Sequence, residues 1–348
     1  MTKKLLLLLL ITLCLLAIVN AQTEKKEVAG KPLQPVGLDS RKFIDPKRQN
    51  WSGTGPKAVR VLLWYPSYDK TSNAYLVGNA DNVPVIKGGA FATGPEKYPL
   101  ILLSHGSGGT AMDLAAWAFY LAARGYIVAA VQHRGDSTEE AETGFLSLSD
   151  QQMWQRPQDV SAVLTSLLED SLFGPRIDTA KIAVAGFSLG GYTAIAVAGA
   201  RLNLESLQAS SDTKNLPPQV RNSVERYIEL LGKNGLLQAS LAHSGDSYKD
   251  RRIKGVFALA PAIGQGFTKE GLSDIDVPVY IVAGETDVVA PKALNAELYA
   301  SGIKDAVLTI LPGEAGHITR PGPVAEQNWQ KVYDLSYHFF EGLWLSKR

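Results

Sequence analysis

The pentapeptide GFSLG at residues 186–190 constrains the fold of this chain more than any other segment. Residues 181–185 before it form an apolar run that is typical of a buried strand, and residues 191–198 after it are small, as in a tightly packed helix. A chain that turns from a strand directly into a helix leaves no room for side chains two residues before and two residues after the serine. The two glycines therefore predict a sharp turn that exposes the Ser188 hydroxyl at its tip.

Apolar runs and helical patterns alternate along the chain from residue 98 onward. Strands are expected at residues 59–66, 98–104, 126–132, 181–187, 254–260, 277–283 and 306–311, and helices at 112–124, 156–170 and 325–345. Strands that are apolar throughout and alternate with helices indicate a parallel sheet that is covered on both faces. A strand, a G-x-S-x-G turn and a helix in this setting are typical of the α/β-hydrolase fold. The sequence thus predicts an α/β protein with a mostly parallel central sheet flanked by helices.

Residues 201–252 interrupt this alternation with a polar stretch that contains one plausible helix, residues 220–231. In an open α/β sheet, an insertion after the helix of the turn lies over the carboxyl ends of the strands, where ligands bind. We therefore expect a small cap or lid here, the alternative being a solvated surface insertion.

The N-terminus has the pattern of a secretory signal peptide. Two lysines precede an apolar run from Leu5 to Val19, and small residues at Val19 and Ala21 predict cleavage after Ala21. A membrane anchor is the alternative, since the run is close to the shortest length that spans a bilayer. Residues 22–50 are polar and contain three prolines, which predicts a linker or arm before a hydrolase domain over residues 51–348.

Charge and cysteine content limit the classes of function. The chain has 35 basic and 34 acidic side chains, so electrostatics gives no reason to expect nucleic acid or an anionic membrane as a partner. Removal of residues 1–21 takes away Cys14, the single cysteine. The mature chain is then expected to contain no disulfide and to use no thiol chemistry.

The base and the acid that a serine nucleophile needs are both found in the part of the sequence that follows Ser188. A serine hydroxyl is activated by an adjacent base, which a carboxylate orients. Asp287 follows the apolar run 279–283, and His317 follows the run 308–311. The order serine, acid, histidine is that of α/β-hydrolases. Ser188, Asp287 and His317 are therefore predicted to form a catalytic triad.

The rivals for these roles are few. Glu285 is the nearest alternative acid, and only His317 among the five histidines follows a strand after the acid. Structural alternatives are an Asp287 that caps a turn and a His317 that bonds to the backbone of its loop.

A glycine-rich loop, HGSGG at residues 105–109, follows the strand at 98–104. Acyl transfer needs backbone donors for the developing oxyanion, and in this fold one comes from the residue after the nucleophile and one from such a loop. The amides of Leu189 and Ser107 are predicted for these two roles. His105 is expected to fix the loop rather than to carry a proton.

Arg134 and residues 156–159 carry charged side chains that could stabilise the structure or contact a substrate. Arg134 is expected to pair with Asp136 or Asp159, the alternative being a contact to a substrate carboxylate. Residues 156–159 are expected to cap a helix and brace a loop. Candidate ligands are scattered without a close-spaced pair, so no metal and no cofactor is predicted.

Four segments in order resemble a known family: HGSGG at 105–109, GFSLGG at 186–191, ALAPAIG at 258–264 and AGETD at 283–287. The resemblance is to the α/β-hydrolases identified as predicted dienelactone hydrolases, relatives of the plasma-type platelet-activating-factor acetylhydrolases, and it covers residues 55–345. It implies a serine hydrolase that acts on esters, with the residue roles given above. True dienelactone hydrolases have cysteine at the turn, and Ser188 in its place favours ester cleavage over the reaction that gives them their name.

The sequence thus predicts a secreted or periplasmic serine hydrolase that cleaves short-chain or lipid-like carboxylic esters through an acyl-enzyme. Its expected partner is a small-molecule ester, without stable membrane insertion after signal cleavage. A peptidase or amidase on the same fold, and an inactive hydrolase fold used for binding, are the alternatives. The acyl length, the alcohol group and the oligomeric state are left open.

Overall fold

The structure of the chain is a computed structural model that describes residues 33–51, 53–69, 75–77, 83–92, 95–133, 152–210, 228–313, 315–317 and 323–345. The predicted signal peptide and residues 22–32 of the predicted linker lie outside the described residues.

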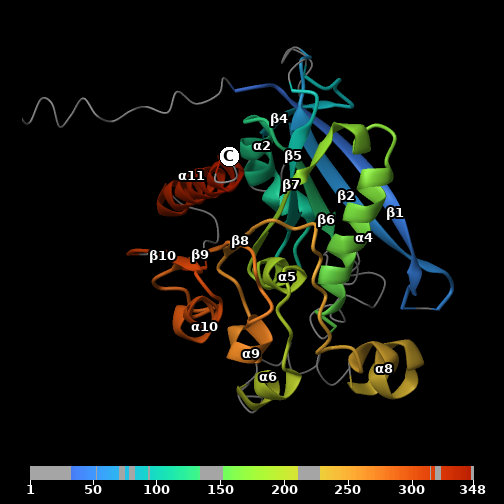
Figure 1. Ribbon diagram of the computed structural model, residues 1–348, viewed down its shortest axis with the longest axis vertical. Coiled ribbons are helices and arrows are strands. Elements are labelled where there is room, and N and C mark those ends of the chain that lie inside the picture. Colours follow the sequence, from blue (N-terminus) through green and yellow to red (C-terminus); the bar gives the residue numbers. More distant parts are fainter. Residues whose placement is uncertain are drawn as a thin grey trace, which may run out of the picture. The chain divides into compact units, whose positions relative to one another are not determined.

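A ten-stranded sheet in the order β10-β9-β8-β7-β5-β6-β2-β1-β4-β3 forms the centre of the fold (Figure 1). All neighbouring pairs from β10 to β6 in this order are parallel. These strands are β5 (Tyr98–Ser104), β6 (Ile127–Gln132), β7 (Ile177–Phe187), β8 (Val256–Leu259), β9 (Val279–Gly284) and β10 (Val307–Leu311). Each coincides with a predicted strand, and the predicted mostly parallel sheet is confirmed.

The other end of the sheet is largely antiparallel. Strand β2 (Pro56–Pro66) pairs antiparallel with β6 and with β1 (Val36–Gln49). Beyond β1, β4 (Val83–Lys87) pairs parallel with β1, and β3 (Tyr75–Val77) pairs antiparallel with β4.

The prediction of a linker over residues 22–50 is wrong for the segment that forms β1. Its side chains alternate between partly buried and exposed positions from Asp39 to Ile44, but the partly buried positions carry charge as well as apolar groups. Arg41, one of them, pairs with Asp170 at 2.9 Å and lies over the Phe173 ring. Because charged side chains are satisfied in this way, the strand shows no apolar alternation in its sequence.

Helices cover both faces of the sheet, as predicted (Figure 1). One apolar cluster packs α4, α5 and α10 on one face, and a second packs α2 and α11 on the other. The bounds are η2 (Ala111–Leu114), α2 (Ala115–Ala122), α4 (Gln155–Glu169), η4 (Gly174–Arg176), α5 (Leu189–Val197), η6 (Gly264–Gly266), α9 (Lys269–Leu272), η7 (Lys292–Leu294), α10 (Ala296–Gly302) and α11 (Pro323–Leu345). In α11 the buried positions 329, 332, 333, 336, 340 and 343 recur at helical spacing.

The described part of the insertion at 201–252 contains α6 (Leu204–Ser210), a helix over 228–233 and α8 (Gly235–Leu241). Only the end of the predicted helix at 220–231 lies within the described residues, and that end is helical. Side chains of α6 and α8 pack in a third apolar cluster with Leu189 and Tyr192 of α5. Parts of the insertion therefore lie beside the first turn of the helix that follows Ser188.

Candidate active site

The turn around Ser188 has the geometry that the two glycines predict. Ser188 adopts φ 56° and ψ −120° between β7 and α5, a conformation that costs a residue with a side chain about 1–3 kcal/mol. A Cβ on Gly186 would lie 2.0 Å from the carbonyl oxygen of Gly190, and one on Gly190 would lie 2.0 Å from that of Ser104. Neither position accepts a larger residue, so the turn can form only with glycine at both.

Ser188, His317 and Asp287 lie in one hydrogen-bonded chain. The Ser188 Oγ is 2.9 Å from the His317 Nε2, and the His317 Nδ1 is 2.7 Å from the Asp287 Oδ2. With Nδ1–H donating to the carboxylate, Nε2 is left to accept the serine proton. The structure thus brings His317 together with Asp287, 30 positions before it, and with Ser188, 129 positions before it.

Asp287 is held in place by its own loop. Its Oδ1 accepts hydrogen bonds from the amides of Val289 (2.9 Å) and Ala290 (2.8 Å), which leaves Oδ2 to face His317. The rival acid, Glu285, instead accepts from the Gly313 amide at 2.9 Å. Glu285 therefore ties the loop of Asp287 to the loop of His317, and Asp287 is the carboxylate that contacts the histidine.

Close packing at the end of β9 brings the His317 loop to Ser188. A Cβ on Gly284 would lie 1.9 Å from the carbonyl oxygen of Ala315, so the two loops meet only because this position is glycine. The Phe187 ring packs against the His317 ring with 5.0 Å between centroids. These contacts fix the plane of the imidazole.

Both predicted oxyanion amides lie close to Ser188. Leu189 is the first residue of α5, where the backbone amide has no acceptor within the helix. Gly106 is so near the nucleophile that an added Cβ would lie 3.3 Å from the Ser188 Cβ. Ser107, the next residue in the loop, is thus placed at the rim of the site.

His105 anchors the glycine loop, as predicted. Its Nδ1 is 2.8 Å from the Gly106 carbonyl oxygen, and its Nε2 accepts from the His133 amide at 3.1 Å. Both ring nitrogens are therefore engaged by backbone groups, with the proton on Nδ1. The ring is 1% exposed, so it has no access to a substrate.

A buried charge network lies behind this loop. Asp159 of α4 is 2.8 Å from both the Arg48 Nη2 and the Lys57 Nζ, and its other oxygen is 3.1 Å from the His133 Nδ1. Burial alone would raise the pKa of Asp159, yet Lys57 and Arg48 outweigh it and hold the pKa far below its ordinary value. Burial, aided by Arg156, lowers the pKa of His133 to about 3, so this ring is neutral.

Ser104, His133 and Asp159 form a second serine-histidine-aspartate chain, with 2.8 Å between the Ser104 Oγ and the His133 Nε2. All three side chains are at most 1% exposed, and Ser104 lies within β5. A nucleophile must reach its substrate, so this chain is structural and braces the end of β5.

The network was only partly predicted. The bracing role of residues 156–159 agrees with the structure, but the capping role does not, because α4 begins at Gln155 and the residue before it, Trp154, makes no side-chain cap hydrogen bond. Among the described residues, Asp159 pairs with Arg48, Lys57 and His133. Arg134 and Asp136 lie outside the described residues. A lysine at the start of a strand as apolar as β2 was the one signal that could have revealed the network.

Two aromatic side chains, Trp154 and Phe267, belong to the apolar cluster that contains Leu189 and Tyr192. Trp154 is 1% exposed and donates through Nε1 to the Ser240 Oγ at 2.9 Å, so it joins α4 to α8 rather than lining open space. Phe267 is partly buried and packs on Tyr192 and Tyr299.

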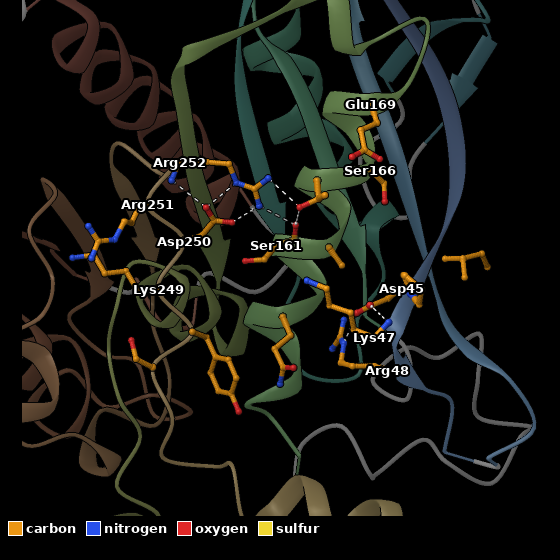
Figure 2. A pocket seen from close by; sticks show the side chains of 17 residues that line it. Asp45, Lys47, Arg48, Ser161, Ser166, Glu169, Lys249, Asp250, Arg251 and Arg252 are labelled. Carbon is orange, nitrogen blue, oxygen red and sulfur yellow. Dashed lines mark hydrogen bonds and ion pairs between the residues drawn. The ribbon is translucent and has the colours of Figure 1, made fainter.

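A cleft of about 730 Å³ lies apart from the triad, between β1, α4 and residues 247–252 (Figure 2). Its walls are charged, but Arg252 pairs with Asp250 at 2.6 Å and Arg48 pairs with Asp45 at 2.6 Å. None of the triad residues lines it. Its importance for the site is that Arg48 reaches from its wall to the buried Asp159.

No described helix has both the length and the apolar character needed to cross a bilayer. Within the same described ranges, no three metal-ligating side chains come together.

Comparison with known proteins gives two family matches on overlapping parts of the chain. A model of "Platelet-activating factor acetylhydrolase, isoform II" matches residues 67–157, which contain the glycine loop. A model of the "Prolyl oligopeptidase family" matches residues 113–204, which contain Ser188. Among solved structures, a ferulic acid esterase from Streptomyces cinnamoneus is similar, with a TM-score of 0.52 and 20% identity over 79% of this chain and 72% of that chain.

These likenesses confirm the α/β-hydrolase fold and the predicted resemblance. Parts of the chain are thus similar to the platelet-activating factor acetylhydrolase and prolyl oligopeptidase families.

Proposed function

We propose that this chain is a secreted esterase in which Ser188 is the nucleophile, His317 the general base and acid, and Asp287 the residue that orients His317. The observation that carries the proposal is the continuous chain of contacts from the Ser188 Oγ to His317 and on to Asp287, at 2.9 and 2.7 Å. Ser188, the first member of this series of contacts, lies at the tip of the strained turn between β7 and α5.

In the first half of the reaction the Ser188 Oγ attacks the ester carbonyl carbon while its proton passes to the His317 Nε2. The C–O bond to the alcohol then breaks, and His317 returns the proton to the leaving alkoxide. An alcohol leaves, and the acyl group stays on Ser188 as an ester.

In the second half His317 takes a proton from water, and the hydroxide oxygen attacks the acyl carbon. The bond to the Ser188 Oγ breaks, the serine regains its proton, and a carboxylic acid leaves. Asp287 keeps its carboxylate against the Nδ1–H throughout and stabilises the imidazolium that forms twice.

The amides of Leu189 and Ser107 are proposed to hold the oxyanion in both halves. Leu189 opens α5, so the helix dipole adds to the attraction of its N–H for negative charge. Loss of one such donor typically costs about 10²–10³ in kcat.

The acyl or alcohol group is proposed to be small or lipid-like and to contact the apolar cluster that joins α6 and α8 to Leu189 and Tyr192. The insertion at 201–252 would then act as a cap. The names of the similar proteins, a platelet-activating factor acetylhydrolase and a ferulic acid esterase, both refer to enzymes that cleave esters, which agrees with this substrate class.

A peptidase or amidase is the second candidate, because the stretch with Ser188 matches the prolyl oligopeptidase family. The same triad can cleave either bond, so only the substrate distinguishes the two.

The test uses p-nitrophenyl esters of increasing acyl length and a peptide anilide, with the wild-type protein and a Ser188→Ala variant. We expect ester turnover that falls by about 10⁴ or more in the variant, and little anilide cleavage. Anilide turnover that matches ester turnover would favour the peptidase. Ester turnover that survives Ser188→Ala would rule out the proposed nucleophile.

Export is tested separately by sequencing the N-terminus of the protein recovered outside the cytoplasm. A start at Gln22 is expected. A start at Met1 in an exported or membrane-bound form would instead support the anchor.

A further inference from the structure

We infer that Arg156 is a positioning residue that sets the place of the oxyanion amide at Ser107 by holding the backbone at His105. The inference rests on the proposed function, since it concerns the loop that would stabilise the oxyanion. It adds a role that neither the triad nor the glycine pattern contains.

Arg156 lies in the first turn of α4 and is 1% exposed. Its Nη2 donates to the carbonyl oxygen of His105 and is 3.4 Å from the Ser104 Oγ. The guanidinium thus contacts the last residue of β5 and the first residue of the loop. A buried cation that donates to a carbonyl forms a strong hydrogen bond, because water does not compete for either group.

The nucleophile turn lies close against the same backbone. A Cβ on Gly190 would lie 2.0 Å from the Ser104 carbonyl oxygen and 2.7 Å from that of His105. Arg156 and the start of α5 therefore both lie against the His105 carbonyl group, and the hydrogen bond from the guanidinium adds to the contacts that fix this backbone.

His133 and Asp159 also hold the loop. His133 receives the Ser104 hydroxyl at its Nε2, and its backbone amide donates to the His105 ring. Asp159 fixes the opposite nitrogen of the His133 ring, and Lys57 and Arg48 fix Asp159. The network therefore reaches from the cleft wall of Figure 2 to the loop.

The direct contact of Arg156 makes it the sharpest member to test. Ser107 follows Gly106, and Gly106 is so close to the nucleophile that a Cβ added to it would lie 3.3 Å from the Ser188 Cβ. A loop that moves by a fraction of an ångström would leave Ser188, His317 and Asp287 intact but misdirect the Ser107 amide. Such a change weakens binding of the tetrahedral state and leaves ground-state binding largely unchanged.

The experiment compares wild type, Arg156→Met and Arg156→Lys in the full chain, after Ser188→Ala has shown that ester cleavage depends on Ser188. We expect Arg156→Met to lower kcat by roughly 10- to 100-fold, with KM changed by less than about threefold. Affinity for an alkyl boronic acid, whose boron bonds to the Ser188 Oγ and forms a tetrahedral mimic, should fall in parallel. Affinity for an ether analogue without a carbonyl should not. Arg156→Lys keeps one donor and should recover part of the loss.

Arg252→Met is the matched control. Arg252 also binds α4, through the Ser161 carbonyl at 3.2 Å and the Thr165 Oγ1 at 3.0 Å, but it does not contact the loop. This variant should lose some stability and keep kcat within about threefold.

Several outcomes would overturn the inference. One is a folded Arg156→Met with wild-type kcat, and another is a loss confined to KM. Equal loss of affinity for the boronic acid and the ether analogue would also count against it. Should Arg156→Met not fold, Arg156→Lys decides, since wild-type kcat and boronate affinity in that variant are incompatible with the inferred role. If Ser188→Ala retains full activity, the proposed function itself is wrong.

Discussion

At the scale of single residues, the contact with His317 distinguishes Asp287 from Glu285, the carboxylate two positions before it. Asp287→Asn removes the charge that orients the imidazole and favours the wrong tautomer. We expect kcat on a p-nitrophenyl ester to fall by about 10²–10⁴. Steady-state kinetics at constant pH measures it.

Glu285→Gln is the control for this prediction. Glu285 accepts from the Gly313 amide and does not contact His317, and a glutamine oxygen can accept the same bond. Its kcat should stay within about threefold of wild type. If instead Glu285→Gln is the more damaging change, the acid has been assigned to the wrong residue.

Gly190 shows how little space the nucleophile turn leaves. The added methyl of Gly190→Ala would overlap the Ser104 carbonyl, and neither backbone can retreat. We expect a loss of about 3 kcal/mol or more in the free energy of unfolding. Urea unfolding followed by circular dichroism measures it.

Gly342→Ala is a matched substitution in a helix. A Cβ there meets nothing within 4 Å, and α11 continues on both sides. Alanine should therefore stabilise the protein by up to about 1 kcal/mol. Similar effects of the two substitutions would contradict the close approach at Gly190.

Residues that act through a local pattern could be predicted from the sequence, and residues that act through distant partners could not. Ser188, Asp287 and His317 follow strands that are plain in the sequence, and their order along the chain matches the fold. The pairing of Lys57 with Asp159 joins positions far apart in the sequence. Nothing in either neighbourhood specifies the other, so the network behind the loop became visible only in the structure.

At the scale of secondary-structure elements, the same contrast separates β5 from β1. β5 is apolar at nearly every position because both of its faces are buried, so it could be predicted. β1 is half exposed and carries paired charges at its partly buried positions, so its composition resembles a linker. The short β3 and β4 were missed as well, since β3 has only three residues and β4 contains a proline, which argues against a strand.

One serine of α8 accepts two hydrogen bonds from the start of α4. The Ser240 Oγ accepts from the Trp154 Nε1 at 2.9 Å and from the Gln155 Nε2 at 2.7 Å. Ser240→Ala leaves these donors without that acceptor, and we expect a loss of about 1–3 kcal/mol in stability. Because the contact is local, amide hydrogen exchange in residues 235–241 should accelerate more than exchange in β5 or β7.

Ser247→Ala is the control, since Ser247 is exposed on the segment that follows. It should leave exchange in α8 unchanged. Equal protection of α8 in wild type and Ser240→Ala would show that the apolar cluster alone holds this part of the insertion.

At the scale of the whole molecule, the buried network makes stability depend on pH in one direction. The folded protein keeps His133 neutral down to about pH 3, whereas an unfolded histidine binds a proton near pH 6.5. The low pKa of Asp159 likewise means that the unfolded chain takes up a proton before the folded one. In both cases the unfolded state binds more protons, so stability rises with pH.

Each group affects stability only in the pH range between its pKa in the unfolded chain and its pKa in the folded protein. His133 should make the free energy of unfolding fall by up to about 1.4 kcal/mol for each pH unit between 6.5 and 3, and Asp159 adds to the fall only below about pH 3.9. Urea unfolding at several pH values between 4 and 8 measures this slope. His133→Asn replaces the ring with an amide that does not titrate, so the variant should be less stable at pH 8 but show a shallower slope between pH 6 and 4. Parallel slopes in the two proteins would mean that His133 is protonated in the fold, and a charged ring could not accept the Ser104 hydroxyl that helps to hold the end of β5.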